Sequence, residues 1–386
     1  MKIETFALER WMTTYELDVE YDIAESGIYP LTVRELLDRE SPAERVEILD
    51  RLLDLRLGYS EARGTLELRS LLAETYEDCS PENILVTTGA IEANFLSFNV
   101  LLEAGDHVIA PYPAYQQLYS VPRALGCDVD LWRIRPETGF RYDVADLERL
   151  IRPETRLIVL NSPHNPTGAM LSAADAERVY ELAASVGAHI LSDEAYRWLE
   201  IPGGDALMPP VYNLGPLGLS VGTLSKPFGL PGLRIGWIAA PAELVARCWS
   251  MRDYVSLSPG KLNDALAVLA LRHRQDVFRR NAAIISANLE AAEDWVAEHR
   301  EIVSWKPPRG GLLALLHYNL DIPSLDLANK LAEEYSVMLA PGSAFGYEHH
   351  LRIGIGQEPS VFRAGLEAAG TCFAELAASG LGRLHG

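Results

Sequence analysis

Along the chain, short and nearly unbroken apolar runs alternate with segments in which the apolar residues have helical spacing. Four runs typical of strands buried in a parallel sheet lie at 83–88, 107–110, 156–162 and 189–193. Helical spacing follows two of them, at 90–102 and 173–186. This strand–helix order predicts an α/β domain with a mainly parallel sheet, whose loops gather at one edge and bind a ligand there.

The two ends of the chain predict a second, smaller unit. Residues 6–15 have an apolar side at helical spacing, and Thr32 with Glu35 forms a capping box for another helix. A long amphipathic segment at 277–299 leads into a C-terminal α/β part with short strands. A length of 386 residues also favours two or three domains. We expect a large domain at 46–284 and a small domain built from 1–45 and 285–386.

Composition narrows the classes of partner. The 34 basic and 54 acidic residues give a net charge of -20, which argues against a nucleic acid or an acidic membrane as partner. The four cysteines form no CxxC pair, so we expect neither a metal site nor a disulfide framework. The N-terminus has no apolar signal core, and no apolar stretch is long enough for a membrane span. We therefore expect a cytoplasmic protein.

A lysine stands at the end of one apolar run. In SVGTLSKPFGLPGLRIGW the run ends at Thr223, Ser225 and Lys226 follow, and Arg234 lies eight residues after the lysine. The Pro and Gly residues after Lys226 exclude a regular helix, so the lysine lies on a loop at the end of a buried strand. A partly desolvated lysine has a depressed pKa and forms a Schiff base with an aldehyde, and Arg234 supplies charge for a phosphate. The alternative is a solvated Lys and Arg on a loop.

Other strand ends carry further candidate groups. One strand passes through Gly89, Ala90 and Ile91 into a helix, where free N–H groups and the helix dipole together form an anion site. At Ile91 only the backbone N–H can contribute to this anion site. The next strand leads into the loop PYPAY, which ends at Tyr115 and places an aromatic ring in the site or in the core.

The two following strands end in polar groups. In NSPHNPTG, two prolines restrict the loop that carries Asn165. The next strand ends at Asp193, with Tyr196 three residues later. A carboxylate at the end of a buried strand is costly unless a cation pairs with it, so we expect a positively charged partner for Asp193.

The motifs NSPHNPTG, SDEAY, TLSK, PGSAFG and LRIGI, taken in this order and spacing, resemble those of the fold type I aminotransferases of class I and II, which bind pyridoxal phosphate (PLP). The likeness covers nearly the whole chain and is least typical in the first 30 residues. It implies an α/β fold with a mainly parallel seven-stranded sheet flanked by helices and a smaller α/β domain from both termini.

The resemblance also implies roles in cofactor binding. Lys226 holds PLP as a Schiff base, Asp193 faces the ring nitrogen, Asn165 and Tyr196 face the phenolic oxygen, and Tyr115 stacks on the ring. The residues implied around the phosphate are Gly89, Ala90, Ile91, Thr223, Ser225 and Arg234. Lys226, Asp193 and Tyr196 are the expected catalytic residues.

Four more positions concern the partner subunit and the substrate. By the resemblance, Tyr59 reaches across a dimer interface to the cofactor phosphate of the other subunit, although a lone Tyr also packs. Arg352 in LRIGI grips the substrate α-carboxylate or else forms an internal salt bridge. Glu25 and Gly27 lie in a loop that the family brings across the substrate. If this loop is not a plain surface turn, Glu25 favours a cationic side chain.

The expected function is that of a PLP-dependent enzyme acting at the α-carbon of an amino acid, first of all a homodimeric aminotransferase of amino and keto acids. The stretch YDIAESGIYPLT also resembles PLP enzymes of the capreomycidine synthase type, which cyclise hydroxylated arginine. Cyclisation, elimination or replacement, and oxidation therefore stay open. A transcription regulator with an aminotransferase-like domain is not expected, because the residues before the first core motif leave no room for a basic winged helix.

Overall fold

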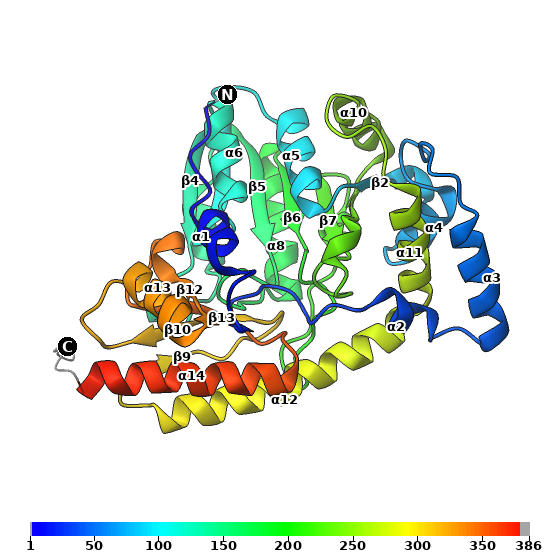
Figure 1. Ribbon diagram of the computed structural model, residues 1–386. Helices are drawn as coiled ribbons and strands as arrows, with labels where there is room; N and C mark the ends of the chain where they lie inside the picture. Colours follow the sequence, from blue (N-terminus) through cyan, green and yellow to red (C-terminus); the bar gives the residue numbers. More distant parts are fainter. Residues whose placement is uncertain (1, 379–386) are drawn as a thin grey trace.

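A seven-stranded sheet forms the centre of the larger part of the molecule (Figure 1). The computed structural model describes residues 2–378. In spatial order the strands are β2 (Ile84–Thr87), β8 (Gly236–Ala239), β7 (Gly218–Thr223), β6 (His189–Asp193), β5 (Thr155–Asn161), β3 (His107–Tyr112) and β4 (Asp128–Arg133). Only β8 runs antiparallel to its neighbours. The predicted fold class, a mainly parallel seven-stranded sheet flanked by helices, is confirmed.

Helices cover both faces of this sheet because its strands are apolar on both sides. In β5, Leu157 and Val159 pack on one helical layer, whereas Ile158 and Leu160 pack on the other. The first layer contains α5 (Ala90–Leu101), α6 (Gln117–Leu125) and α10 (Ala242–Arg252). The second contains α4 (Leu66–Ala73), α7 (Val144–Leu150), α8 (Ala173–Val186), α9 (Val211–Leu214) and α11 (Lys261–Arg272).

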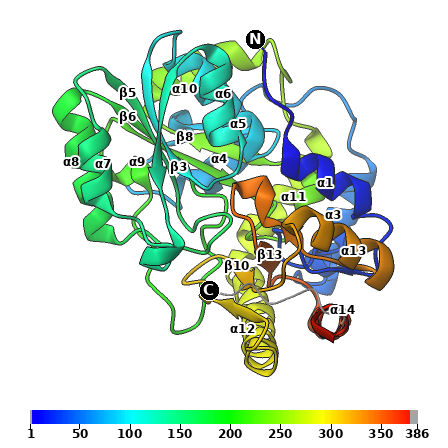
Figure 2. The same ribbon diagram turned by 90° about the vertical axis from the view of Figure 1, so that its left-hand side faces the viewer.

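Segments from the N-terminal and the C-terminal part of the chain pack together in the smaller part (Figure 2). Its antiparallel sheet has the order β12 (Ala340–Pro341), β13 (His350–Gly354), β10 (Leu313–Tyr318) and β9 (Val303–Trp305). Near the N-terminus, β1 (Tyr21–Asp22) pairs in parallel with β11 (Val337–Met338). The surrounding helices are α1 (Ala7–Tyr15), α12 (Arg274–Glu298), α13 (Ser324–Tyr335) and α14 (Pro359–Ala378).

Two more helices and four 3-10 turns complete the described chain. They are α2 (Val33–Leu37), α3 (Pro42–Leu53), η1 (Pro81–Asn83), η2 (Pro136–Thr138), η3 (Pro231–Leu233) and η4 (Gly342–Phe345). The capping box predicted for α2 is present, since Glu35 N donates to Thr32 Oγ1 at 3.1 Å and Thr32 N donates to Glu35 Oε2 at 2.7 Å.

The packing of the hydrophobic cores does not decide where the two predicted domains begin and end. Ile23 and Ile28 pack with the C-terminal strands, whereas Leu36 and Leu37 of α2 pack with α4 and α11. The helix α12 continues across residue 285 as one element. The division at 45 and 285 therefore stays a prediction.

Two possible features are missing from residues 2–378. None of their helices combines the length and hydropathy needed to cross a bilayer. Nor do they contain a group of three or more His, Cys, Asp or Glu side chains placed to hold a metal ion.

Candidate active site

A pocket of about 370 Å³ lies where the carboxyl ends of β5, β6 and β7 face the start of α5, β13 and the N-terminal residues. The predicted site residues that line it are Glu25, Ala90, Ile91, Tyr115, Asn165, Asp193, Tyr196, Thr223, Ser225, Lys226, Arg234 and Arg352. Ligands bind at this edge in open parallel sheets, because the strands end there and their loops diverge. The fold therefore brings together side chains from seven separate segments of the chain.

Lys226 lies deep in the pocket, with its amine held by the N-terminal loop. Its Nζ donates to Ser26 Oγ at 2.7 Å and to Glu25 Oε1 at 3.3 Å. Burial lowers the pKa of Lys226, but the charges of Glu25 and Tyr196 outweigh burial, so the pKa is raised. The expectation of a depressed lysine pKa is therefore wrong for this arrangement, because it left out the carboxylate.

Glu25 reaches the pocket because a tight turn precedes it. Asp22 Oδ1 accepts the backbone N–H groups of Ala24 at 3.0 Å and Glu25 at 2.9 Å. Lys226 lowers the pKa of the Glu25 carboxyl. Gly27 lies beside this side chain, since a Cβ there would be 3.0 Å from Glu25 Oε1. The loop thus crosses the pocket and is not a plain surface turn, while the substrate roles of Glu25 and Gly27 stay predictions.

Asp193 is a buried carboxylate without a cationic partner. Its side chain is 5% exposed, accepts from Asn94 Nδ2 at 2.8 Å and from Ala195 N at 3.1 Å, and makes no ion pair within residues 2–378. Burial raises its pKa, whereas the hydrogen bond from Asn94 opposes that rise. Oδ1 of Asn94 is buried in the same pocket without a hydrogen-bond partner. The arrangement fits a ligand that brings a protonated nitrogen.

Asn165 is oriented by the first residue of its own motif. Asn161 Oδ1 accepts from Asn165 N at 2.8 Å, and Asn161 Nδ2 donates to the carbonyl of Asp193 at 2.9 Å. This pair of bonds ties the loops after β5 and β6 together. Tyr196, buried nearby, has a pKa raised mainly by burial.

The start of α5 forms the opposite end of the pocket. Gly89 precedes the helix with φ 79° and provides no side-chain cap, so the N–H groups of the first turn face the pocket end. A Cβ on Gly89 would lie 2.6 Å from Nη2 of Arg234, which shows how closely the guanidinium approaches the backbone. Arg234 itself has φ 50°, a conformation that costs energy for a residue with a side chain. Thr223 Oγ1 and Ser225 Oγ lie 3.0 Å apart beside it.

Arg352 is 1% exposed, and burial lowers its pKa. Nη1 donates to Asn165 Oδ1 at 3.2 Å and Nη2 donates to the carbonyl of Ala24 at 2.8 Å, but Nε has no partner. No carboxylate of residues 2–378 lies within ion-pair distance, so the alternative of an internal salt bridge is not what the chain forms. A buried cation in this state calls for an external anion.

Tyr115 contacts the N-terminal helix. Its hydroxyl donates to Glu9 Oε1 at 3.0 Å, and its ring centroid lies 4.8 Å from that of Phe6. Sequence reasoning missed Glu9, Asn94 and Asn161. The available signals were weak: Asn94 lies one helical turn after Ala90, and Asn161 begins a motif of which only the later Asn was selected.

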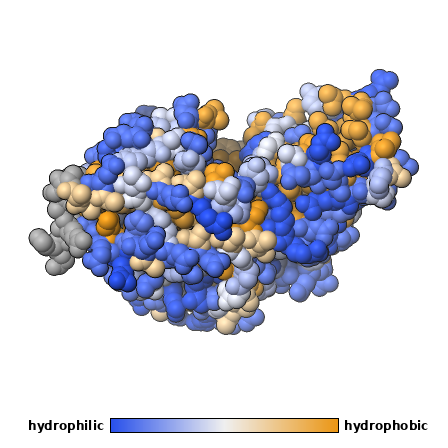
Figure 3. Space-filling model, turned by 60° about the horizontal axis from the view of Figure 1, so that its bottom comes forward, coloured by the Kyte–Doolittle hydropathy of each residue, from blue (hydrophilic) through white to orange (hydrophobic). Residues whose placement is uncertain are grey.

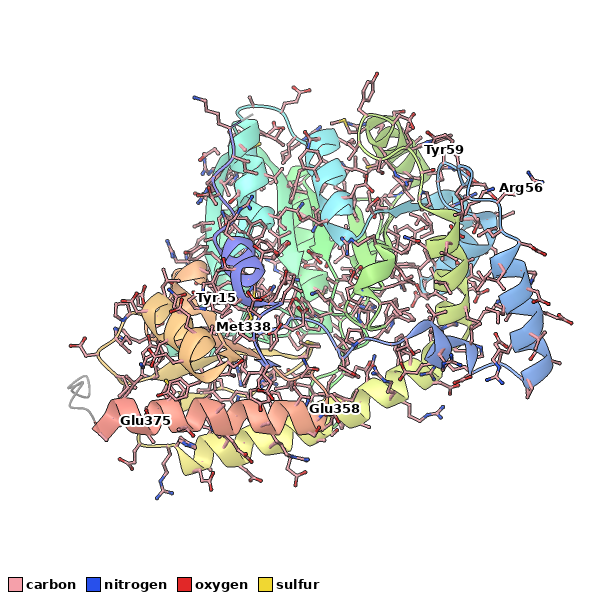
Figure 4. All side chains as sticks on the ribbon, in the orientation of Figure 1. Tyr15, Arg56, Tyr59, Met338, Glu358 and Glu375 are labelled. Atoms are coloured by element: carbon pink, nitrogen blue, oxygen red, sulfur yellow. The ribbon has the colours of Figure 1, made fainter. Side chains whose placement is uncertain are left out.

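Tyr59 is not part of this chain's pocket. It is 83% exposed in the loop between α3 and α4 and does not line the pocket, and Figure 4 shows it at the upper right of the molecule, on the opposite side from Tyr15 of α1. The predicted role of Tyr59 in a partner subunit is neither supported nor contradicted by this position.

The side chains present fit PLP. The N–H groups in the first turn of α5, which no side chain caps, and the guanidinium of Arg234 suit a phosphate, and the unpaired carboxylate of Asp193 suits a protonated ring nitrogen. Lys226 is the one lysine of the described pocket lining. The individual residue roles remain predictions.

Comparison with known proteins places this geometry in context. The model of the family described as aminotransferase class I and II matches residues 34–368. Capreomycidine synthase of Streptomyces vinaceus is 32% identical over 379 residues, covering 98% of this chain and 95% of that protein. A PLP-dependent aminotransferase from Streptococcus suis 89-1591 superposes with a TM-score of 0.92 at 36% identity, covering 97% of this chain and 99% of that one. The PLP-dependent cyclase OrfR has a TM-score of 0.88 at 33% identity, covering 98% and 99%.

Proposed function

Because the chain belongs to the class I and II aminotransferase family, with PLP as its expected cofactor, we propose that it transfers the amino group of an amino acid to a keto acid. The observation that carries this proposal is the pairing, in one pocket, of a lysine with a buried arginine that lacks an anion. The arginine suits the α-carboxylate of an amino acid, and the lysine lies in the same cavity to act on its α-carbon.

PLP, when bound, supplies a ring that withdraws electrons from the α-carbon of the substrate. The chain's own residues do the rest. Asp193 keeps a proton on the ring nitrogen, because a buried carboxylate without a cation stabilises a positive charge beside it. Asn165 and Tyr196 provide polar groups at the pocket wall, where they suit the phenolic oxygen.

Lys226 has two tasks in this proposal. Its amine would hold the cofactor and, once released, would remove the α-proton of the substrate and deliver it to the aldehyde-derived carbon of the cofactor. Ser26 and Glu25 orient the Nζ atom for this transfer. Arg352 fixes the other end of the substrate through its unpaired Nε and its remaining N–H groups.

We further propose a cytoplasmic homodimer with shared active sites, in which Tyr59 of each subunit serves the cofactor phosphate of the other. The apolar surface around α3 supports this. That helix has no buried residue in the single chain. Exposed apolar side chains on it and on the following loop are Val46, Leu49, Leu53, Leu57 and Tyr59. Figure 3 shows orange atoms at the right-hand end of the molecule, where α3 lies. A surface of this kind is costly to leave in water.

A second candidate function is cyclisation, elimination or replacement at the β-carbon. It is favoured by the contact of Glu25 and Ser26 with Lys226, which places two more polar groups at the reacting end of the pocket. Two of the similar proteins, capreomycidine synthase and the cyclase OrfR, also support it.

Incubation of the PLP-loaded protein with a panel of amino acids distinguishes the two functions. Transamination yields the keto acid, and it converts the cofactor to its amine form until a keto acid is added. Cyclisation or elimination leaves the cofactor in its aldehyde form and yields a product with a different mass. If no amino acid changes the cofactor spectrum or the products, both proposals are wrong.

A further inference from the structure

The helix α1 and its C-cap residue, Glu16, place two carboxylates on the wall of the active-site pocket. Glu9, Met12 and Glu16 line the pocket together, because positions three, four and seven apart fall on one helical face. The two glutamates are separated by two turns, or about 10.5 Å along the axis. Neither makes an ion pair within residues 2–378. This wall of the pocket therefore carries negative charge that is not matched by a close ion pair within residues 2–378.

The orientation of α1 is held by contacts on its other side. Trp11 Nε1 donates to Asn329 Oδ1 at 2.9 Å, and Tyr15 donates to Glu333 at 2.7 Å. Leu8, Trp11 and Met12 are buried in the core of the smaller part. Because both contacts reach α13, which lies beside α1 in Figure 1, the helix cannot turn its carboxylates away without breaking them.

The opposite charge lies deeper in the same pocket. Arg352 is buried with Nε unpartnered, and Glu9 acts on its pKa through charge, so the two groups share one electrostatic environment. Glu9 is further fixed by the hydroxyl of Tyr115. The pocket thus presents a buried cation that needs an anion and, towards α1, anions that need a cation. A substrate with an α-carboxylate and a distal positive charge complements both.

We propose that Glu9 and Glu16 determine substrate choice by receiving a guanidinium or ammonium group at the far end of the side chain of the amino acid. This inference rests on the proposed function, since it assumes that an amino acid binds with its carboxylate at Arg352. Acidic side chains are excluded by the same charges, because a carboxylate at this position would be repelled by both glutamates.

Arginine and citrulline provide a matched test, because the two have nearly the same shape and differ in the charge of the terminal group. The quantity to measure is the dissociation constant of each amino acid, obtained from the spectral change when that amino acid is added to the PLP-loaded protein. The wild type should bind arginine more tightly by up to about fivefold per carboxylate at low salt, as for partly exposed ion pairs. Added salt should reduce this preference, because exposed charges are screened.

The double variant Glu9→Gln with Glu16→Gln should lose the preference and its salt dependence while citrulline binding changes little. The amide oxygen that the first substitution introduces can still accept from Tyr115, so the pocket wall is kept. Asp18→Asn is the control, since it removes an exposed charge just beyond α1 that does not line the pocket.

The outcomes separate the two levels of the proposal. If the wild type binds arginine and citrulline equally, or the double variant keeps the arginine preference, the inference about α1 is wrong although the enzyme still binds amino acids. If no amino acid changes the spectrum, the proposed function itself fails.

Discussion

The carboxylate of Glu25 lies 3.3 Å from the amine of Lys226, although 201 positions separate the two residues in the chain. Because of this contact, the protonation of Lys226 depends on a loop near the N-terminus. It also explains why the lysine pKa is raised in spite of burial. Predictions about the lysine therefore involve both residues.

Lys226 should be the residue that carries the cofactor. Borohydride reduction of the PLP-loaded protein followed by peptide mapping should find the pyridoxyl group on Lys226, because no other lysine lines the described pocket. Lys226→Ala should lose the absorbance of the lysine-bound cofactor while it still binds PLP noncovalently. A label on a different lysine would overturn the assignment.

Glu25→Gln should speed the capture of PLP by the cofactor-free protein. Without the carboxylate, burial lowers the pKa of Lys226 unopposed by its main raising charge, and the neutral amine is the nucleophile. Each unit of fall raises the neutral fraction about tenfold at a pH below the pKa. The rate of cofactor binding can be followed by absorbance from about pH 6 to 9. The pH profile of this rate should lie at lower pH in the variant than in the wild type. Overlapping profiles for wild type and variant would show that the contact does not control the lysine.

Gly89→Ala should weaken cofactor retention. The added Cβ would lie 2.6 Å from Arg234 Nη2 and so displaces the guanidinium from the start of α5. Loss of hydrogen bonds to a charged phosphate lowers affinity by about tenfold to a hundredfold. Equilibrium dialysis of PLP measures the effect.

Gly105→Ala is the matched control for that variant. Gly105 also has positive φ, at 93°, but a Cβ there meets nothing within 4 Å. Both variants carry backbone strain, so both should lose some thermal stability, and only Gly89→Ala should lose PLP affinity. Equal PLP affinities in the two variants would contradict a role for the start of α5 in binding the phosphate.

Arg352→Ala should raise the KM for every amino acid tested, by about a hundredfold to a thousandfold, the cost of leaving one member of a buried ion pair alone. Arg352→Lys keeps the positive charge but lacks the planar guanidinium, so its KM values should lie between those of the wild type and those of Arg352→Ala. PLP affinity should stay near that of the wild type. A variant with unchanged KM would show that the substrate carboxylate binds elsewhere.

Tyr59→Phe should weaken PLP retention in a protein that still sediments as a dimer, because the variant lacks only the hydroxyl that we propose serves the partner's phosphate. Tyr254→Phe is the control, since Tyr254 is a tyrosine with 90% exposure that does not line the pocket. A fully active monomer, or equal retention in the two variants, would contradict the shared site.

Local patterns in the sequence determined most strands of the sheet and much of the pocket, but they did not predict β4 and β8. The strands buried on both faces appear as unbroken apolar runs, and the residues that follow them, such as Lys226, Asp193 and Asn165, had to meet at one edge because parallel strands end together. These inferences need only the residue types and their order along a short stretch.

Only the tertiary structure decided which distant side chains meet inside that pocket. Glu9 reaches Tyr115 across 106 positions and Asn94 reaches Asp193 across 99, because α1 lies against the loop after β3 and α5 packs against β6. No period or motif encodes such contacts. The sign of the pKa shift at Lys226 depends on one of them, since burial alone lowers that pKa and the carboxylate of Glu25 reverses the shift.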